Sequence, residues 1–174
     1  MCNPIEFGTC EEGVYSIQSW IDGVDAEESV PTLSDTEQYV YGLEAGRILR
    51  KIHSIPAPEA NANGQLHIID FNRNDYGDPW EEFNRIVWCG QKSPLFASGM
   101  VNGYFDGEIP MEFWKLLALY ISSNTLSSVY WAVPYGQNEI NTMLNQAKDV
   151  LSWYDNMCNS IPTWYTNSAR NFFR

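Results

Sequence analysis

The chain has 174 residues, of which 44% are hydrophobic and 14% aromatic, so it can bury the core of one folded domain. Acidic residues outnumber basic ones by 22 to 10, which gives a net charge of −12. This charge argues against nucleic acid and anionic membranes as partners, because both attract clustered Lys and Arg. It favours cationic small molecules or a basic partner.

The sequence gives no sign of export, of a zinc site or of a membrane span. The four cysteines are dispersed and form no pair at zinc-ligand spacing: Cys2, Cys10, Cys89 and Cys158. The first residues lack the pattern of a secretory signal, so we expect a cytoplasmic protein with reduced thiols. The apolar stretch over residues 109–132 includes charged and polar residues and is expected to form a buried core helix.

Residues 1–33 are expected to form a β-hairpin, a hinge and an acidic loop. The segments 4–10 and 14–21 are rich in Ile, Val, Tyr, Phe and Trp, and Glu11-Glu12-Gly13 between them is typical of a hairpin turn. Asp22-Gly23 ends the second strand. The acidic loop then follows over residues 24–33.

Residues 34–174 are expected to form a helical part, so that the whole chain is one α+β, mainly helical domain. Ser34-Asp35-Thr36-Glu37 is a capping box that opens a helix running to about His53. Gly42 and Gly46 on this helix leave room for another backbone to come close. Further helices are expected over residues 80–88, from Pro110 to about 132 and over 140–157, and a buried strand over Leu66–Phe71.

Two acidic residues lie at or after the predicted strand. Asp70 is at its exit, where ligands bind in many sheets, and a lone carboxylate suits Mg²⁺ that keeps waters or phosphate oxygens as its other ligands. The alternative for Asp70 is a structural role, as a turn cap or as the ion-pair partner of Arg73. Asp78 comes directly before Pro79-Trp80, and we expect it chiefly to cap a helix or hold the Asp70 loop.

Histidine and aromatic residues give weaker indications. We expect His53 and His67 to be structural, because no nucleophile motif accompanies them, and neither common glycine-rich phosphate loop occurs. The aromatic residues of the C-terminal part could line a pocket for a cation or a sugar, although their helical spacing favours core packing. These residues are Trp131, Tyr135, Trp153, Tyr154, Trp164 and Tyr165.

Several segments together resemble the aminoglycoside phosphotransferases. The run Tyr15–Gly23 is similar to the family's hinge strand, and Gly46–Pro56 is similar to the helix that follows it. The run Ile68–Trp80, with Ile-Asp at 69–70 and Gly-Asp-Pro at 77–79, is similar to the family's metal-binding segment and is the most specific part. The family is protein-kinase-like and transfers the γ-phosphoryl group of ATP or GTP to a hydroxyl of an antibiotic or another small molecule.

The resemblance implies a protein-kinase-like C-lobe preceded by an N-terminal hairpin and hinge. It implies that the backbone around Ser19, Trp20 and Ile21 meets the adenine of the nucleotide. It also implies that Asp70 holds Mg²⁺ against the phosphates, in a reaction that depends on positioning and charge stabilisation.

The sequence departs from the family at the catalytic loop. The motif His-Gly-Asp-x-x-x-x-Asn does not occur, and only residues 59–65 separate Pro58 from Leu66 where it belongs. Because the chain starts at the strand pair before the hinge, we also expect the phosphate-covering loop, the strand lysine and its glutamate partner to be missing. No catalytic residue can therefore be assigned, and Mg²⁺ and nucleotide are expected to bind weakly or not at all.

Three hypotheses follow. The first is a shortened aminoglycoside phosphotransferase, associated with antibiotic resistance by resemblance but inactive alone. The second is a non-catalytic domain that binds cationic small molecules in an acidic cleft. The third is an active kinase completed by another chain. The open edge of the hairpin also predicts self-association, because unpaired strand edges invite pairing.

Overall fold

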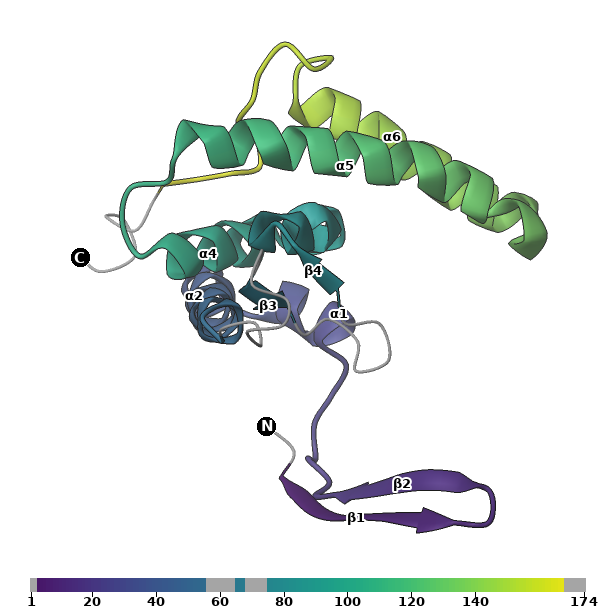
Figure 1. Cartoon of the computed structure of the whole chain (residues 1–174). Coiled ribbons are helices and arrows are strands. Elements are labelled where there is room, and N and C mark those ends of the chain that lie inside the picture. The colour runs from purple at the N-terminus through teal and green to yellow at the C-terminus, as the bar shows by residue number, and fades with distance from the viewer. Residues whose placement is uncertain (1–2, 56–64, 68–74, 168–174) are drawn as a thin grey trace.

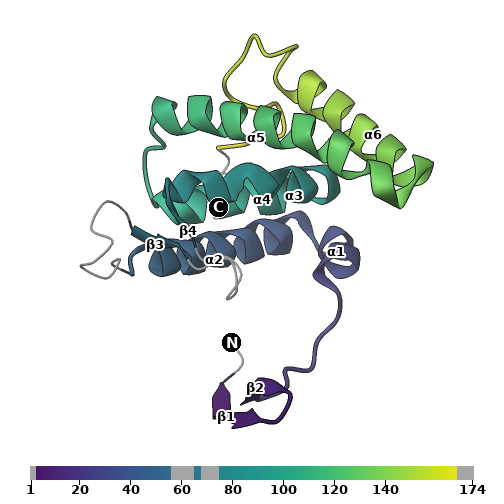
Figure 2. The same cartoon turned by 45° about the vertical axis from the view of Figure 1, so that its right-hand side comes forward.

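The computed structural model describes residues 3–55, 65–67 and 75–167. Its long helices form layers: α2 (Asp35–His53) lies against α4 (Pro94–Phe105), and α5 (Met111–Trp131) lies over them beside α6 (Gln137–Trp153). Figure 2 shows these layers stacked one on another, with the N-terminal hairpin apart from them. The described chain is α+β and mainly helical, with two small antiparallel sheets, which confirms the predicted fold class at that level.

Strands β1 (Pro4–Cys10) and β2 (Gly13–Gln18) form the predicted hairpin. The strands are antiparallel, Glu11 and Glu12 make the turn, and the register shifts between Pro4 and Glu6. The second strand ends at Gln18, three residues before the predicted end. Every residue of the two strands is exposed except Gly8, which is partly covered by the ring of Tyr15.

Short helical turns replace two predicted segments. The expected acidic loop contains α1 (Ala26–Ser29) and η1 (Val30–Thr32), because Asp25 caps the first turn by accepting a hydrogen bond from the N–H of Glu27. The single helix predicted over 80–88 is instead η3 (Pro79–Arg85) followed by α3 (Ile86–Lys92). A 3₁₀ turn aligns residues three apart, which brings Phe83 and Ile86 into the same core.

Strand β3 (Gln65–His67) pairs with β4 (Asp75–Gly77), which the sequence did not predict. The backbone of an isolated strand needs hydrogen-bond partners, and β4 supplies them from a segment predicted to be a loop. The predicted strand over Leu66–Phe71 is therefore described only up to His67. The remainder of it, including Asp70, lies outside the described residues.

Helix α2 begins as predicted and packs closely on α4, a helix that the sequence did not indicate. Both arms of the capping box form: the Ser34 Oγ accepts from the Glu37 N–H at 3.4 Å, and Glu37 Oε2 accepts from the Ser34 N–H at 3.0 Å. Two glycines of each helix lie at the crossing, and a Cβ atom on any of them would overlap the other helix's backbone. They are Gly42, Gly46, Gly99 and Gly103.

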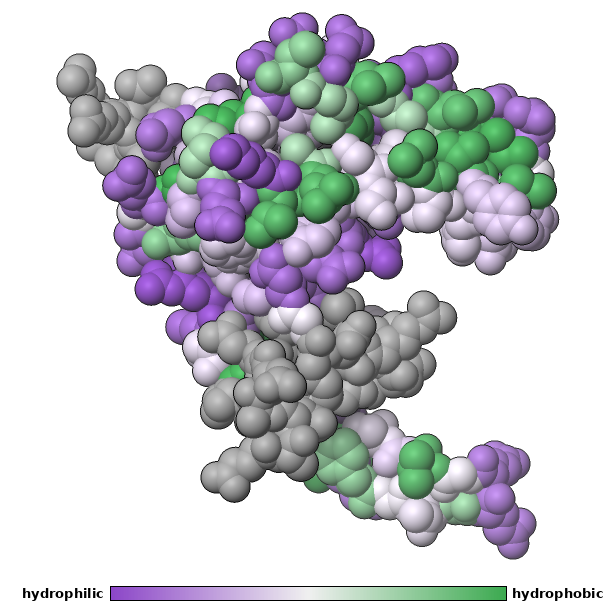
Figure 3. Space-filling view, turned by 45° about the horizontal axis from the view of Figure 1, so that its top comes forward, coloured by the Kyte–Doolittle hydropathy of each residue, from purple (hydrophilic) through white to green (hydrophobic). Residues whose placement is uncertain are grey.

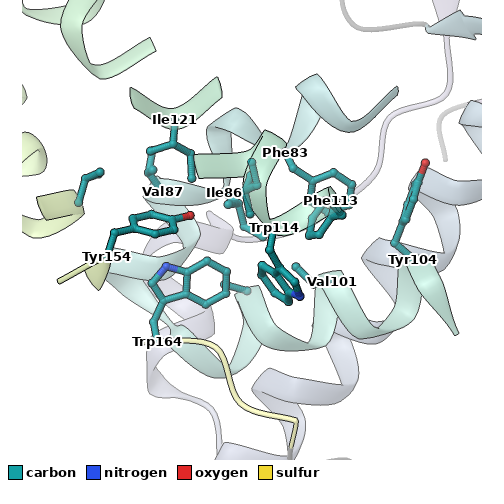
Figure 4. Packing of buried hydrophobic residues seen from close by; sticks show 13 residues of the cluster. Phe83, Ile86, Val87, Val101, Tyr104, Phe113, Trp114, Ile121, Tyr154 and Trp164 are labelled. Atoms are coloured by element: carbon teal, nitrogen blue, oxygen red, sulfur yellow. The ribbon is translucent and has the colours of Figure 1, made fainter. Parts of the chain in front are cut away.

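The core lies between α3, α4, α5 and α6. Figure 4 shows its aromatic centre, in which the Phe113 ring meets Phe83 edge-on at 5.2 Å and Trp114 at 5.1 Å between centroids. Tyr154 also enters the core, as the residue that ends α6. Helix α6 thus stops before the predicted end at 157, because Asp155, Asn156 and Met157 adopt left-handed backbone angles.

Helix α5 is buried only along part of its length. Its buried residues are Phe113, Trp114, Leu117, Ile121 and Thr125. Beyond them Leu126 and Tyr130 are strongly exposed, so the prediction of a core helix as far as 132 is wrong for the last two turns. Pro110 is the cap of α5 rather than its first residue. Among the described helices, none has the length and apolar character needed to cross a membrane.

Candidate functional site

A polar site is centred on Asp78, between β4 and η3. Its Oδ1 accepts a hydrogen bond from the Trp80 N–H at 3.0 Å and so caps η3. Its Oδ2 accepts a hydrogen bond from the hydroxyl of Tyr120, on α5, at 2.6 Å. Asp78 therefore has the capping role predicted from its position before Pro79, and it also joins the end of β4 to α5.

The bond to Asp78 has a clear effect on Tyr120. Because the carboxylate accepts a hydrogen bond from the protonated hydroxyl, it favours the neutral phenol and raises the pKa of Tyr120 to about 12. Burial and the charges of Asp78 and Glu81 act in the same direction. The hydroxyl of Tyr120 thus stays protonated through the physiological range and acts here as a hydrogen-bond donor.

Trp80 anchors the same turn on the core. Its ring lies 5.7 Å from that of Phe113, edge-on, and 6.0 Å from that of Phe105. Phe113 is fully buried. The turn Gly77-Asp78-Pro79-Trp80 is therefore held through a hydrogen bond on one side and through aromatic packing on the other.

A cavity of about 320 Å³ lies where α2 and α4 end, and its lining residues are Arg50, His53, Ser54, Tyr104 and Phe105. His53 is buried, and its Nδ1 lies 2.9 Å from the Tyr104 hydroxyl. Burial, and secondarily the charge of Asp78, raises the pKa of Tyr104 to about 12. The Arg50 guanidinium lies 3.8 Å from Asp106. The burial of His53 and its contact with Tyr104 fit the structural role predicted for it.

The predicted metal ligand Asp70 and its possible partner Arg73 lie outside the described residues. Among the residues that the structure does describe, no group of three or more His, Cys, Asp or Glu could hold a metal ion. Both carboxylate oxygens of Asp78 accept hydrogen bonds from the protein. Asp70 as a Mg²⁺ ligand therefore stays a prediction.

The predicted nucleotide contacts Ser19, Trp20 and Ile21 follow β2. The Ser19 Oγ accepts from the Asn3 N–H at 2.8 Å, and the Ser19 N–H donates to the Asn3 carbonyl at 2.9 Å, so Ser19 closes the base of the hairpin. Trp20 is 88% exposed. The end of β2 lies apart from α5 in both views (Figures 1 and 2), so the structure does not bring these residues to Asp78.

The aromatic residues divide into two groups. Tyr154 and Trp164 are buried in the core, and Trp153 and Tyr165 pack against it, which confirms core packing for these four, although Trp164 and Tyr165 lie outside the described helices. Trp131 and Tyr135 are instead exposed, and together with Tyr130, Val133 and Pro134 they line a cavity of about 390 Å³.

Sequence reasoning missed Tyr120 as a part of the Asp78 site and Tyr104 as the partner of His53. Tyr120 lies 42 residues from Asp78 along the chain, and only the packing of α5 on η3 brings the two together. No local motif marks either tyrosine. Comparison of the chain with protein-family models, with curated proteins and with solved structures found no match.

Proposed function

We propose that this chain is the helical lobe of a protein resembling the aminoglycoside phosphotransferases, in a form that does not transfer phosphate. One observation carries the proposal: the turn Gly77-Asp78-Pro79-Trp80, which bears the most specific part of the resemblance, is fixed by the Tyr120 hydrogen bond and by the packing of Trp80. A metal-binding segment needs such support, because its ligands must be held by neighbouring groups. Asp70 would be the metal ligand beside this turn.

The lack of turnover follows from the chemistry of the segment before β3. Residues 54–64 contain neither aspartate nor histidine, so the family's base has no counterpart there. Phosphoryl transfer depends on a base, a lysine and metal ligands acting together, and the loss of one member of such a unit lowers the rate by orders of magnitude. The nearby cavity is lined by Arg50 and by hydroxyl groups. These groups suit the binding of a phosphate group and do not supply a base that would activate the acceptor hydroxyl.

A non-catalytic role in binding cationic small molecules is the alternative, and the charge distribution favours it. Glu81 and Glu82 lie three and four residues after Asp78, in the first turn of η3. Burial, opposed by Arg85 and assisted by Glu81, raises the pKa of Glu82, and an ammonium group bound there would favour its ionised form. With a net charge of −12, the chain attracts polycations at long range, and these acids would receive the ammonium groups.

The hairpin is the proposed site of self-association. Each strand of a two-stranded sheet has one open edge, and Ile5, Phe7 and Val14 are each at least two-thirds exposed. A second copy would offer an edge of the same length and spacing, so that two hairpins would form one larger sheet.

Labelled phosphate transfer from ATP and GTP to an aminoglycoside tests the main proposal. We expect no transfer above background from the intact chain and none from Asp70→Asn, with nucleotide binding measured in parallel by calorimetry. Phosphate transfer that is present in the intact chain and lost in Asp70→Asn would overturn the proposal that the chain is inactive. It would also show that Asp70 works as a metal ligand. Transfer unchanged in Asp70→Asn would contradict the metal role of Asp70.

A further inference from the structure

The corner between α5 and α6 carries a cluster of aromatic residues that lie outside the hydrophobic core described above. Tyr130 and Trp131 end α5, and Val133, Pro134 and Tyr135 form η4. These residues line a cavity of about 390 Å³. Figure 1 shows the end of α5 and the start of α6 together at one extremity of the molecule, and Figure 3 shows green hydrophobic residues beside paler ones at that extremity.

Two aromatic rings of this corner pack against each other, and both side chains remain more than half exposed. The rings of Trp131 and Tyr135 lie 4.6 Å apart between centroids at an angle of 35°, and the side chains are 54% and 63% exposed. Pro134 restricts the backbone between them, and Ala132 is fully buried, which anchors the turn. The two rings are thus held before any ligand binds, which lowers the entropic cost of binding.

The chemistry of the lining selects among ligand classes. The polar side-chain groups of the cavity are the two tyrosine hydroxyls and the indole N–H of Trp131, and the lining includes no carboxylate, which a metal ion needs. Residues 116–147 contain no Lys or Arg and one acid, Glu139, in a chain of net charge −12. An anion is therefore disfavoured, and a cation that donates no hydrogen bonds is favoured.

We propose that Trp131, Tyr135 and Tyr130 form a binding site for a quaternary ammonium group. Such a cation is attracted to the faces of aromatic rings and requires no hydrogen-bond acceptor. The site is separate from the Asp78 site: Trp131 lies eleven residues beyond Tyr120 on α5, which is about 16 Å along the helix axis. The proposal therefore stands independently of any phosphotransferase relationship.

Choline and its neutral isostere 3,3-dimethylbutan-1-ol provide the test, because the two differ mainly in the positive charge. Each is titrated into the full chain at constant ionic strength, and binding is followed by ligand-observed NMR so that the readout does not depend on tryptophan fluorescence. We expect saturable choline binding and at least about fivefold weaker binding of the isostere. Equal binding of the two compounds, or no choline binding, would overturn the proposal.

Two variants locate the site. Trp131→Leu removes an aromatic face and is expected to weaken choline binding about fivefold or more. Trp20→Leu is the matched control, because Trp20 is also strongly exposed but lies beyond the hairpin. It should leave choline binding unchanged. Circular dichroism establishes that both variants are folded, and equal losses in the two would overturn the assignment to Trp131.

Discussion

Two tyrosine hydroxyls in the helical part have opposite surroundings. The Tyr120 hydroxyl donates to Asp78 at 2.6 Å. The Tyr154 hydroxyl is buried beside the core residues of Figure 4 and has no hydrogen-bond partner among the residues that the structure describes, and its burial raises the pKa of Tyr154. A buried hydroxyl without a partner costs about 1–3 kcal/mol, whereas a satisfied one contributes about 1 kcal/mol.

Removing the same oxygen atom from the two tyrosines should therefore change stability in opposite directions. We expect Tyr154→Phe to raise the free energy of unfolding by about 1 kcal/mol and Tyr120→Phe to lower it by about 1 kcal/mol. Urea denaturation followed by circular dichroism measures both, and each variant serves as the control for the other. A loss of stability in Tyr154→Phe would show that its hydroxyl has a partner after all.

At the scale of single residues, the sequence predicted the features that depend on neighbouring residues along the chain. The cap at Asp78 was predictable because Asp78 immediately precedes Pro79, and a proline at the first helical position is a local signal. The bond to Tyr120 was not predictable, because it depends on how η3 packs against α5. The metal role of Asp70 rests on resemblance alone and stays a prediction.

The crossing of α2 and α4 depends on the absence of side-chain atoms at four glycines. A methyl group at Gly42 would overlap the Phe96 carbonyl, which is backbone and cannot turn aside. We expect Gly42→Ala to lower the free energy of unfolding by about 2 kcal/mol through overpacking. Gly23→Ala is the matched control, because a Cβ at Gly23 meets open space. Equal stability of the two variants in denaturant titrations would contradict the close crossing.

This crossing also shows where the prediction of elements failed. The spacing of Gly42 and Gly46 indicated that a backbone comes close, and it does. The partner helix α4 went unrecognised because its buried residues include Ala97, Gly99 and Val101 and lie around most of its circumference. A helix buried on several sides has no single apolar stripe, so periodicity does not mark it.

The hairpin formed by β1 and β2 should associate through its open edges. We expect the chain to dimerise at high concentration, and Phe7→Lys to abolish this, because a charge on an edge strand opposes pairing. Tyr41→Lys makes the same kind of change on an exposed residue of α2 and should leave association unaltered. Sedimentation velocity over a range of concentrations measures both, and a strict monomer at every concentration would refute the prediction.

Salt should strengthen this association rather than weaken it. The described hairpin carries Glu6, Glu11 and Glu12 and no basic residue, so two copies repel each other at low ionic strength. Salt screens that repulsion.

For the molecule as a whole, the capping box, the helical spacing and the hairpin turn predicted the mainly helical α+β class, which is confirmed, whereas the cationic partner inferred from charge stays a prediction. The excess of acids is not spread evenly: residues 1–46 hold ten acidic residues and no basic one. Net charge attracts any polycation without specifying where it binds. The place of binding must therefore be tested by neutralising acids at two locations while the total charge is kept the same.

Glu81→Gln with Glu82→Gln removes two charges beside Asp78, and Glu11→Gln with Glu12→Gln removes two charges at the hairpin turn. If ammonium groups bind at η3, the first pair should weaken binding of a polycationic aminoglycoside by about fivefold, as two partly screened ion pairs do, and the second pair should change it little. Calorimetry at low and high salt measures both, since screening should weaken the binding further. Equal weakening by the two pairs would mean that only the overall field attracts the polycation, and the η3 acids would then have no binding role.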